Sequence, residues 1–514
     1  MTTPFFSDGT KDEFHPDNWQ SGTSSKLPDR HPETGLDVLI VGAGPAGLMT
    51  ALECWRKGHN IVGILERSDA PVYTGDVIVI GPSALRAFRH WPDMCDELKE
   101  AKTDSIMYYY SHTGDLILGP TSLGHNDPDY TAAWEGIPYA APHQRRKTFY
   151  QMLLRQVAKL GLEVEYGQRV ENYFEDEVAG VGGVVTSNGT VRVADIVVAA
   201  DANKTSSELL IAGERTPPHL SGMSVYRTAF PTELALRHEA FKTRWGAVVA
   251  NGDSHHEFWI GPGMHLGLFI APEFVAFGLT PRDSFLQPGG NEPIESWDAD
   301  VKPGDVIEIL RRVPGWHPAV ECILSNAQDH AIVHWPLLWR NLRRDWVSKG
   351  GRVVQVGDAA HSTIPASISG GTLALEDAVT LASCLQISCS AGAKQGSPIG
   401  ARIYNLLRYQ RVSCVQKLSF VNAECLAAAS KEEMMKRSPE DMRIRFPKWV
   451  FKHDPEAYAY EKYGQAFAHL VSGAEFDNTN FPPGHKFKPW TIEEIHKDIV
   501  AGKRIADFLD GDWA

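Results

Sequence analysis

A glycine-rich segment between a short apolar run and a helical pattern constrains the fold of this chain more than any other feature. The segment is Gly42-Ala43-Gly44-Pro45-Ala46-Gly47, a G-x-G-x-x-G sequence. Residues 36–41 before it are almost continuously apolar, which is typical of a strand covered on both faces. Residues 45–57 carry apolar side chains at helical spacing, and a second apolar run follows at 60–66. The sequence therefore predicts a β-α-β unit at this point.

The residues of this segment suit the binding of a dinucleotide. Gly42 permits a tight turn, Gly44 lets the backbone approach a pyrophosphate, and Gly47 lets the helix pack closely against the strand. The N-terminus of the helix offers free N–H groups to the anion. Glu66 ends the second apolar run, where a carboxylate accepts the hydroxyls of an adenosine ribose and repels a 2′-phosphate. The segment alone does not distinguish FAD from NAD.

Composition excludes several other classes of protein. The chain has 514 residues, a formal net charge of -14 and seven cysteines without metal-ligand spacing. An acidic surface does not neutralise phosphates, so we expect no nucleic-acid partner. Because the cysteines lack metal-ligand spacing, we expect no metal site. The scattered cysteines are typical of a reducing compartment, and we find neither a secretory signal nor an apolar run of membrane-spanning length. We expect a cytoplasmic protein with no membrane span, either a monomer or a homodimer.

A second motif, more than 300 residues later, favours FAD. Gly357-Asp358-Ala359-Ala360-His361 is followed by Pro365, by Gly370 and Gly371, and by Ala-Leu-Glu-Asp-Ala at 374–378. Together with the first motif, this arrangement resembles the group A flavoprotein monooxygenases, the aromatic hydroxylase family with a para-hydroxybenzoate hydroxylase-like fold. Residues 368–372, Ile-Ser-Gly-Gly-Thr, depart from the G-Q-G-x-N that this family usually has.

The resemblance implies roles for individual residues. Asp358 is expected to hydrogen-bond a ribityl hydroxyl, and Pro365 to lie beside the flavin ring. Gly357, Gly370 and Gly371 belong to the turns whose backbone faces the flavin. Further implied cofactor contacts are Ala46, Arg67 and Gly75, together with Arg146, for which Arg145 is the alternative, and Asp201 in Ala199-Ala200-Asp201-Ala202, where Ala202 replaces the usual glycine.

The same resemblance implies the cofactors and the order of domains. FAD is expected to be tightly but not covalently bound, with NADPH or NADH as transient reductant and O2 as oxidant. The expected fold is α/β: a Rossmann-like FAD-binding domain of the glutathione-reductase type, with an inserted antiparallel β-sheet substrate domain and a helical C-terminal region. We place a flexible leader at 1–34, the FAD-binding domain at 35–215 with interleaved strands of the substrate lobe, the substrate domain at 216–345, the returning FAD-binding segment at 346–390 and the helical region at 391–514.

Two polar residues are the candidates for catalysis. Asp76 lies in the segment 74–78, which lines the flavin on its substrate side in the family, and Arg227 lies on the first expected strand of the substrate lobe. This pair resembles that of fungal indole-alkaloid monooxygenases of the paraherquamide and citrinadin type. The resemblance implies oxidation of the indole C2–C3 bond of a prenylated alkaloid, with a semipinacol shift to a spiro-oxindole. Asp76 would anchor a basic nitrogen or the indole N–H, and Arg227 would act as a hydrogen-bonding acid near the new oxygen.

Several alternatives stay open. A hydroxylase of a phenolic or polyketide aromatic differs from this prediction only in its substrate, and a non-enzymatic binding protein of the same fold would lack flavin. Asp76 can also be a turn residue, and Arg227 a structural flavin contact. His255 and His256 lack a carboxylate partner at metal-ligand spacing, so we interpret them as a surface pair at a strand end. Phe258, Trp259 and Phe269 are expected mainly in the core.

Overall fold

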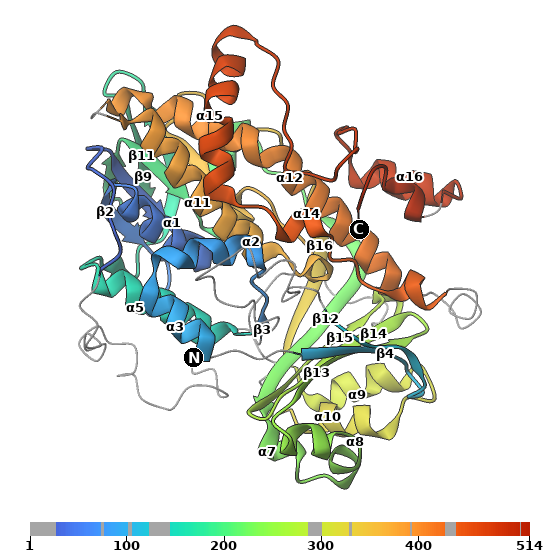
Figure 1. Cartoon of the computed structure of the whole chain (residues 1–514). Coiled ribbons are helices and arrows are strands. Elements are labelled where there is room, and N and C mark those ends of the chain that lie inside the picture. Colours follow the sequence, from blue (N-terminus) through green and yellow to red (C-terminus); the bar gives the residue numbers. More distant parts are fainter. Residues whose placement is uncertain are drawn as a thin grey trace.

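A computed structural model describes residues 27–72, 77–100, 105–122, 144–285, 301–327, 332–390, 393–426, 438–503 and 505–513. Figure 1 shows two lobes, one built around a parallel sheet with helices and one around a larger sheet, with the long helix α12 running from the first toward the second. The α/β fold predicted from the sequence is confirmed, including its inserted sheet domain and its helical C-terminal region.

The parallel sheet is assembled from distant parts of the chain. Its strand order is β17-β11-β1-β2-β7. The strands are β1 (Asp37–Val41), β2 (Asn60–Leu65), β7 (Val164–Glu165), β11 (Ile196–Ala199) and β17 (Val353–Gln355). The returning strand β17 pairs with β11 in parallel, so the segment near residue 353 completes the sheet that begins at residue 37.

Helices cover one face of this sheet and a small antiparallel sheet covers the other. Helices α1 (Pro45–Arg56), α5 (Arg146–Lys159) and α11 (Gly370–Ser388) bury their apolar side chains against the first face, which forms the largest hydrophobic core. The small sheet has the order β10-β9-β8, with β8 (Val170–Asp176), β9 (Val181–Thr186) and β10 (Val191–Ala194). Its side chains form a second core with those of β1 and β11.

Two strand segments of this lobe are shorter or less covered than their apolar sequences suggest. Residues 193–200 do not form one strand, because the chain bends at Asp195, whose carboxylate accepts hydrogen bonds from the Asp37 N–H at 2.8 Å and from Lys394 Nζ at 2.9 Å. Strand β2 is covered at its carboxyl end only, since its neighbour β7 pairs with two of its residues and Asn60 and Val62 are exposed.

The second lobe contains a seven-stranded sheet with the order β16-β12-β15-β14-β13-β4-β5. Its strands are β4 (Ser105–Ser111), β5 (Leu116–Thr121), β12 (His219–Pro231), β13 (Ser254–Gly261), β14 (Met264–Ile270), β15 (Phe274–Pro281) and β16 (Val333–Trp339). The sheet is mixed, because β4 comes from the first part of the chain and runs parallel to β13. Helices α7 (Thr232–Ala235), α8 (Glu239–Ala250), α9 (Pro303–Arg311) and α10 (Pro318–Ser325) cover one face, and the other face is turned toward the first lobe.

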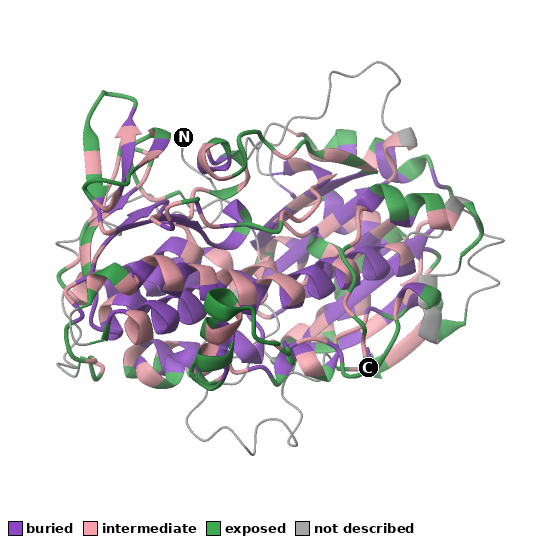
Figure 2. Ribbon diagram, turned by 90° about the horizontal axis from the view of Figure 1, so that it is seen from above, coloured by how far each residue is buried: buried purple, intermediate pink, exposed green. Residues whose placement is uncertain are grey.

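The C-terminal helices are α12 (Ser397–Leu426), α14 (Lys448–Phe451), α15 (Pro455–Ser472) and α16 (Ile492–Val500). Helix α15 is joined to α1 by buried ion pairs: Glu456 contacts Arg56 at 3.0 Å and also Lys57, and Arg56 contacts Glu53 at 2.5 Å. Figure 2 shows the buried residues, in purple, concentrated in the interior of the molecule. The remaining described elements include α2 (Pro82–Leu85), α3 (Pro92–Glu100), α6 (Ser207–Ala212), β3 (Val77–Ile78) and β6 (Gln144–Arg145).

Residues 27–34 belong to the expected flexible leader, yet they are tied to α1. The His31 N–H donates to the Arg56 carbonyl at 2.8 Å, and Arg30 Nε donates to the Trp55 carbonyl at 3.0 Å. Thr34 is buried. Within the described ranges, no helix combines the length and the apolar character that crossing a membrane requires.

Candidate functional site

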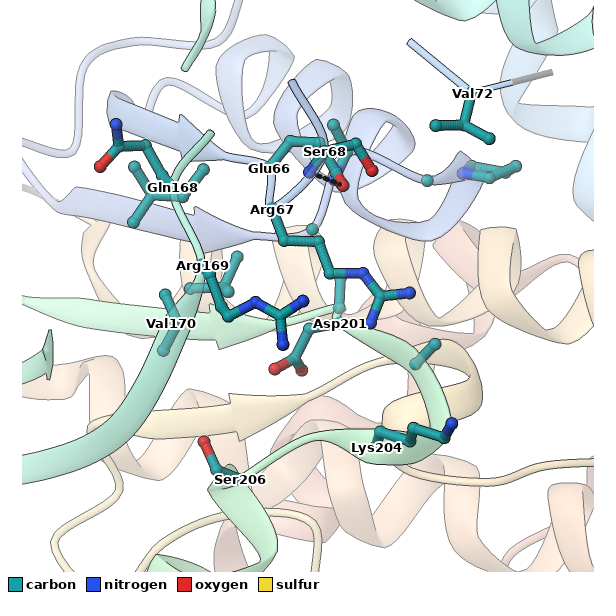
Figure 3. Close-up of a pocket in the computed structure, with 18 of the residues that line it drawn as sticks. Glu66, Arg67, Ser68, Val72, Gln168, Arg169, Val170, Asp201, Lys204 and Ser206 are labelled. Carbon is teal, nitrogen blue, oxygen red and sulfur yellow. Dashed lines mark hydrogen bonds between the residues drawn. The ribbon is translucent and has the colours of Figure 1, made fainter. Parts of the chain in front are cut away.

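A cavity of about 480 Å³ opens at the carboxyl ends of the parallel strands, where β1 and β2 enter their loops. Such crevices at strand ends are where α/β sheets bind ligands. The residues predicted to bind the cofactor that line it are Gly42, Gly44, Glu66, Arg67, Arg146 and Asp201. Figure 3 shows Glu66, Arg67 and Asp201 around this cavity, with Arg169 and Lys204 beside them. Residues that lie far apart in the sequence are therefore brought to one site.

The three glycines of the first motif have the roles that their positions predict. Gly42 adopts φ +101°, and a Cβ there would lie 2.3 Å from the Ala200 carbonyl oxygen. A Cβ on Gly47 would lie 1.9 Å from the Gly42 carbonyl oxygen, so only glycine allows α1 to approach β1 this closely. A Cβ on Gly44 would meet nothing within 4 Å, because that side of the residue faces the cavity. The segment thus leaves room for a group that touches the backbone.

The start of α1 offers donors to that group. Gly44 is its N-cap residue and provides no side-chain hydrogen bond, and Pro45 occupies the first helical position. The first backbone N–H groups of a helix have no partner within the helix, and the helix dipole places positive charge there. Open space beside Gly44 and these donors fit the pyrophosphate of a dinucleotide.

Glu66 is held in place at the end of β2. Its Oε2 accepts a hydrogen bond from the Ala43 N–H at 2.9 Å, and its Oε1 accepts one from the Ser68 N–H at 3.0 Å. The carboxylate also lines the cavity. This orientation fits a residue that accepts the hydroxyls of an adenosine ribose.

Asp201 carries a carboxylate whose charge is poorly solvated. Its Oδ2 accepts a hydrogen bond from the Tyr173 hydroxyl at 2.8 Å, while its Oδ1 is buried without a hydrogen-bond partner among the described residues. Burial raises the pKa of Asp201 to about 6, although hydrogen bonds from Thr205 and Tyr173 act in the opposite direction. Ala202, which follows, has φ +64°, a left-handed conformation that favours glycine. This conformation explains why the family usually has glycine at this position.

The Gly357–His361 motif is packed between α1 and α11. Gly357 adopts φ +59°, and a Cβ there would lie 3.0 Å from the Cβ of Ala46 and 3.2 Å from that of Ala374. Asp377 accepts hydrogen bonds from the Gly357 N–H at 2.9 Å and from His361 Nε2 at 2.6 Å. Gly357 and His361 therefore position the turn.

Asp358 lies in the same turn but lines neither the cavity described above nor the second large cavity described below. Its side chain is exposed and lines a small hollow together with Arg343 and Gln416. Its predicted hydrogen bond to a ribityl hydroxyl stays a prediction.

A second cavity, of about 360 Å³, separates the open face of the seven-stranded sheet from the turn at residues 363–371. The predicted residues Arg227, Pro365, Gly370 and Gly371 all line it. The turn contains a short 3₁₀ helix at Pro365–Ser367 and leads into α11, which begins at Gly370. The segment predicted to lie beside the flavin ring and the candidate catalytic arginine thus share one cavity.

Two histidines in this cavity were not predicted from the sequence. His256 on β13 and His265 on β14 both line it, and burial lowers the pKa of His256 to about 3 and that of His265 to about 4. Both imidazoles are therefore neutral at pH 7. The interpretation of His255 and His256 as a surface pair was wrong, because His256 is 7% exposed and faces the cavity.

Strand periodicity contained the signal for these histidines. Alternate residues of a strand share a face, so His256 lies on the same face as Phe258, and both line the cavity. Trp259 points the other way and is part of the core under the helices, as expected. Phe258 and Phe269, by contrast, line the cavity.

Two predicted residues lie outside the described residues, namely Gly75 and the candidate catalytic residue Asp76. Val77, the first described residue after them, lines the second cavity. Among the residues that the structure describes, no group of three or more histidine, cysteine or acidic side chains is placed to hold a metal ion.

Comparison with known proteins gives a family match and relatives that match over the full length. The family described as FAD binding domain matches residues 35–396. A FAD-dependent monooxygenase of Claviceps purpurea is 71% identical over 514 residues, and FAD-dependent monooxygenase AacuC of Aspergillus aculeatus is 68% identical over 513 residues, each covering 100% of both chains. Notoamide E oxidase notB of an Aspergillus species is 27% identical over 470 residues, covering 88% of this chain and 94% of the relative.

Solved structures have the same fold. FqzB has a TM-score of 0.74 at 24% identity, covering 89% of this chain and 99% of its own. CtdE, crystallised with FAD and a substrate, has a TM-score of 0.72 at 26% identity, covering 85% of this chain and 100% of its own.

Proposed function

The chain belongs to the FAD binding domain family and is an FAD-dependent monooxygenase, and from this premise we propose that it inserts oxygen into an electron-rich aromatic ring of a secondary metabolite. The observation that carries the proposal is the second cavity, in which the turn at Pro365–Gly371 faces an open sheet surface bearing Arg227. Named monooxygenases this similar over the full length contradict the non-enzymatic alternative.

The residues of the first cavity fit the adenosine and pyrophosphate parts of FAD. The N-terminus of α1 would bind the pyrophosphate beside Gly44, and Glu66 would accept the ribose hydroxyls. When bound, FAD takes a hydride from NADPH or NADH and supplies activated oxygen from O2. We infer that Arg146 and Asp201, which line the same cavity, complete the cofactor contacts.

In the second cavity, the protein orients the substrate and excludes water. Arg227 lines it from β12 and can donate hydrogen bonds to a substrate oxygen. His256 and His265 are neutral, so each can donate from one ring nitrogen and accept at the other without adding charge. Phe258, Phe269, Leu337 and Phe420 supply apolar wall. Such a lining holds an aromatic ring and hydrogen-bonds the oxygen atoms attached to it.

The described lining supports a phenolic or polyketide aromatic as the substrate class. Its charged groups are Arg227 and Glu424, and its remaining polar groups include neutral imidazoles and hydroxyls. Hydroxyl and carbonyl oxygens of a polyketide aromatic are suited to these donors. Notoamide E oxidase, whose name states its substrate, is only 27% identical to this chain, so it gives the alkaloid limited support.

The second candidate is oxidation of the indole C2–C3 bond of a prenylated alkaloid, with rearrangement to a spiro-oxindole. The position of Arg227 in the cavity and the 26–27% identity to CtdE and to notoamide E oxidase favour it. In this reaction Asp76 would anchor the substrate nitrogen, so the candidate depends on a residue outside the described ranges.

The experiment that tests the proposal measures NADPH and NADH oxidation by the purified, FAD-containing protein. A polyhydroxylated polyketide aromatic and a prenylated indole alkaloid are compared, and products are analysed by mass spectrometry for one added oxygen. Faster oxidation and an oxygenated product with the polyketide aromatic support the first candidate. The same result with the alkaloid alone would support the second candidate instead. If neither compound speeds NAD(P)H oxidation or gains an oxygen atom, the proposed aromatic substrate class is contradicted.

A further inference from the structure

Four residues in neighbouring strands form a row across the floor of the second cavity. Arg227 on β12 is opposite Gly278 on β15, Gly278 is opposite Gly267 on β14, and Gly267 is opposite Phe258 on β13. All four line the cavity. Two glycines in central strands therefore lie side by side between a guanidinium group and an aromatic ring.

The backbone does not require glycine at either position. Neither residue has a positive φ. A Cβ on Gly278 would lie 3.6 Å from Val225 Cγ2, and a Cβ on Gly267 would lie 3.8 Å from Phe258 Cε1, which are ordinary van der Waals contacts. Glycine weakens the interior of a strand and often marks the close approach of a ligand. The absence of side chains at positions 267 and 278 thus enlarges the cavity, and these contacts show no packing reason for glycine at either position.

Three polar side chains and one phenylalanine border this flat area along the strands. His265 lies two residues before Gly267 on β14 and is opposite Thr280. In the other direction Phe269 follows on β14 and is opposite His256. Because alternate residues share a face, all four side chains surround the glycine pair, and all four line the cavity.

The wall opposite the floor is the turn at residues 363–371. A ring that lies flat on the glycine pair is therefore held between the sheet backbone and this turn. A side chain at position 267 or 278 would project into the same gap and reduce its height by the thickness of a methyl group.

We propose that Gly267 and Gly278 form a seat for a flat substrate of fused aromatic rings, with Arg227 and the two histidines hydrogen-bonding oxygen atoms at its edges. This inference rests on the proposed function and narrows its substrate class. The glycine pair determines which ring systems enter, whereas the chemistry of oxygen insertion stays with the cofactor.

The test uses Gly267→Ala, Gly278→Ala and the double variant of the FAD-containing protein. Binding of three phenols with one, two and three fused rings, namely resorcinol, 1,3-dihydroxynaphthalene and 1,8-dihydroxyanthraquinone, is measured by isothermal titration calorimetry. Overpacking a well-fitted site costs about 1–3 kcal/mol, which corresponds to a loss of roughly 5- to 150-fold in affinity. We expect a loss in this range for the three-ring compound in each single variant, a larger loss in the double variant, and little change for resorcinol.

Gly246→Ala on α8 is the matched control, because its Cβ would contact only Lys242 Cβ, at 3.8 Å, outside the cavity. Gly246→Ala should retain FAD and bind all three phenols as the wild type does, and flavin absorbance after gel filtration shows whether the cavity variants keep FAD. Unchanged affinity for the three-ring phenol in the double variant overturns the proposal. Loss of FAD from the variants also overturns it, because the glycines would then contact the cofactor and not the substrate. A wild-type protein that holds FAD but binds none of the phenols also refutes it. Failure of the proposed function gives a different result from failure of the seat, because the wild type would then bind the three-ring phenol without oxidising it.

Discussion

Asp377→Asn should weaken both the fold and the retention of FAD. Asp377 is fully buried and accepts hydrogen bonds on both carboxylate oxygens: Oδ1 from Arg408 Nε at 2.7 Å, and Oδ2 from the Gly357 N–H at 2.9 Å and His361 Nε2 at 2.6 Å. Burial by itself would raise the pKa of Asp377, but His361 and Arg408 lower it below its usual value, so the group is a carboxylate at neutral pH.

The structure sets the size of the effect. Asparagine has one accepting oxygen and one donating amide group, so in either orientation an N–H faces an N–H. Breaking a buried charge pair costs about 3–5 kcal/mol. Arg408 retains its contact with Glu376 at 2.5 Å, so its charge is not left without a partner. We therefore expect the lower end, a loss of about 3 kcal/mol in the free energy of unfolding.

The assay is urea unfolding followed by tryptophan fluorescence, together with flavin absorbance after gel filtration. Asp96→Asn is the control, because Asp96 forms an exposed ion pair with Lys99 at 3.0 Å, and such pairs contribute little. The reasoning is refuted if Asp377→Asn unfolds at the same urea concentration as the wild type and keeps its full content of FAD.

Further predictions concern flavin retention, the pH dependence of stability, and turnover. Gly47→Ala should lose FAD on gel filtration, because its Cβ would meet the Gly42 carbonyl at 1.9 Å and force α1 away; full flavin content would contradict this. In flavin-free protein, the pKa of Asp201 is about 6, above the usual unfolded value of about 3.9, so its contribution to stability is present at low pH and lost as the pH rises through 6. Melting temperatures should show Asp201→Asn gaining stability over the wild type above that pH and not below about pH 4; a constant difference would refute the assignment. Arg227→Ala, and likewise Asp76→Ala, should keep FAD but lower turnover, as steady-state kinetics will show, whereas Asp358→Ala should weaken flavin retention; wild-type turnover in the first two would end their catalytic assignment.

Much of the cofactor site was predictable from the sequence because its constraints are local. Gly42, Gly44 and Gly47 lie within one turn between a strand and a helix, and their roles follow from the backbone geometry of that turn. Glu66 follows from the length of the same β-α-β unit. The discontinuous sheet was also predictable, since the strand near residue 353 is a short apolar run followed by a glycine.

The substrate cavity was much less predictable because it depends on pairing between strands. His256 and His265 face the same cavity as Arg227 only when β12, β15, β14 and β13 align in this register. The bend at Asp195 was not predictable for a related reason, since Lys394, which donates a hydrogen bond to Asp195, lies in another part of the chain. A pattern along the sequence does not contain these contacts.

The ion pairs between α15 and α1 limit which fragments of this chain can be expected to fold on their own. The family match ends at residue 396, yet Glu456 contacts Arg56 and Lys57 at the C-terminal end of α1, the helix that begins at the dinucleotide-binding turn. Ala459 and Ala466 of α15 also belong to the main hydrophobic core. A fragment cut at the family boundary would leave Arg56 and Lys57 without Glu456 and expose apolar surface on α11 to water. For expression, crystallisation or domain exchange, residues 35–396 are therefore not an independent folding unit, and the helices after them must be kept.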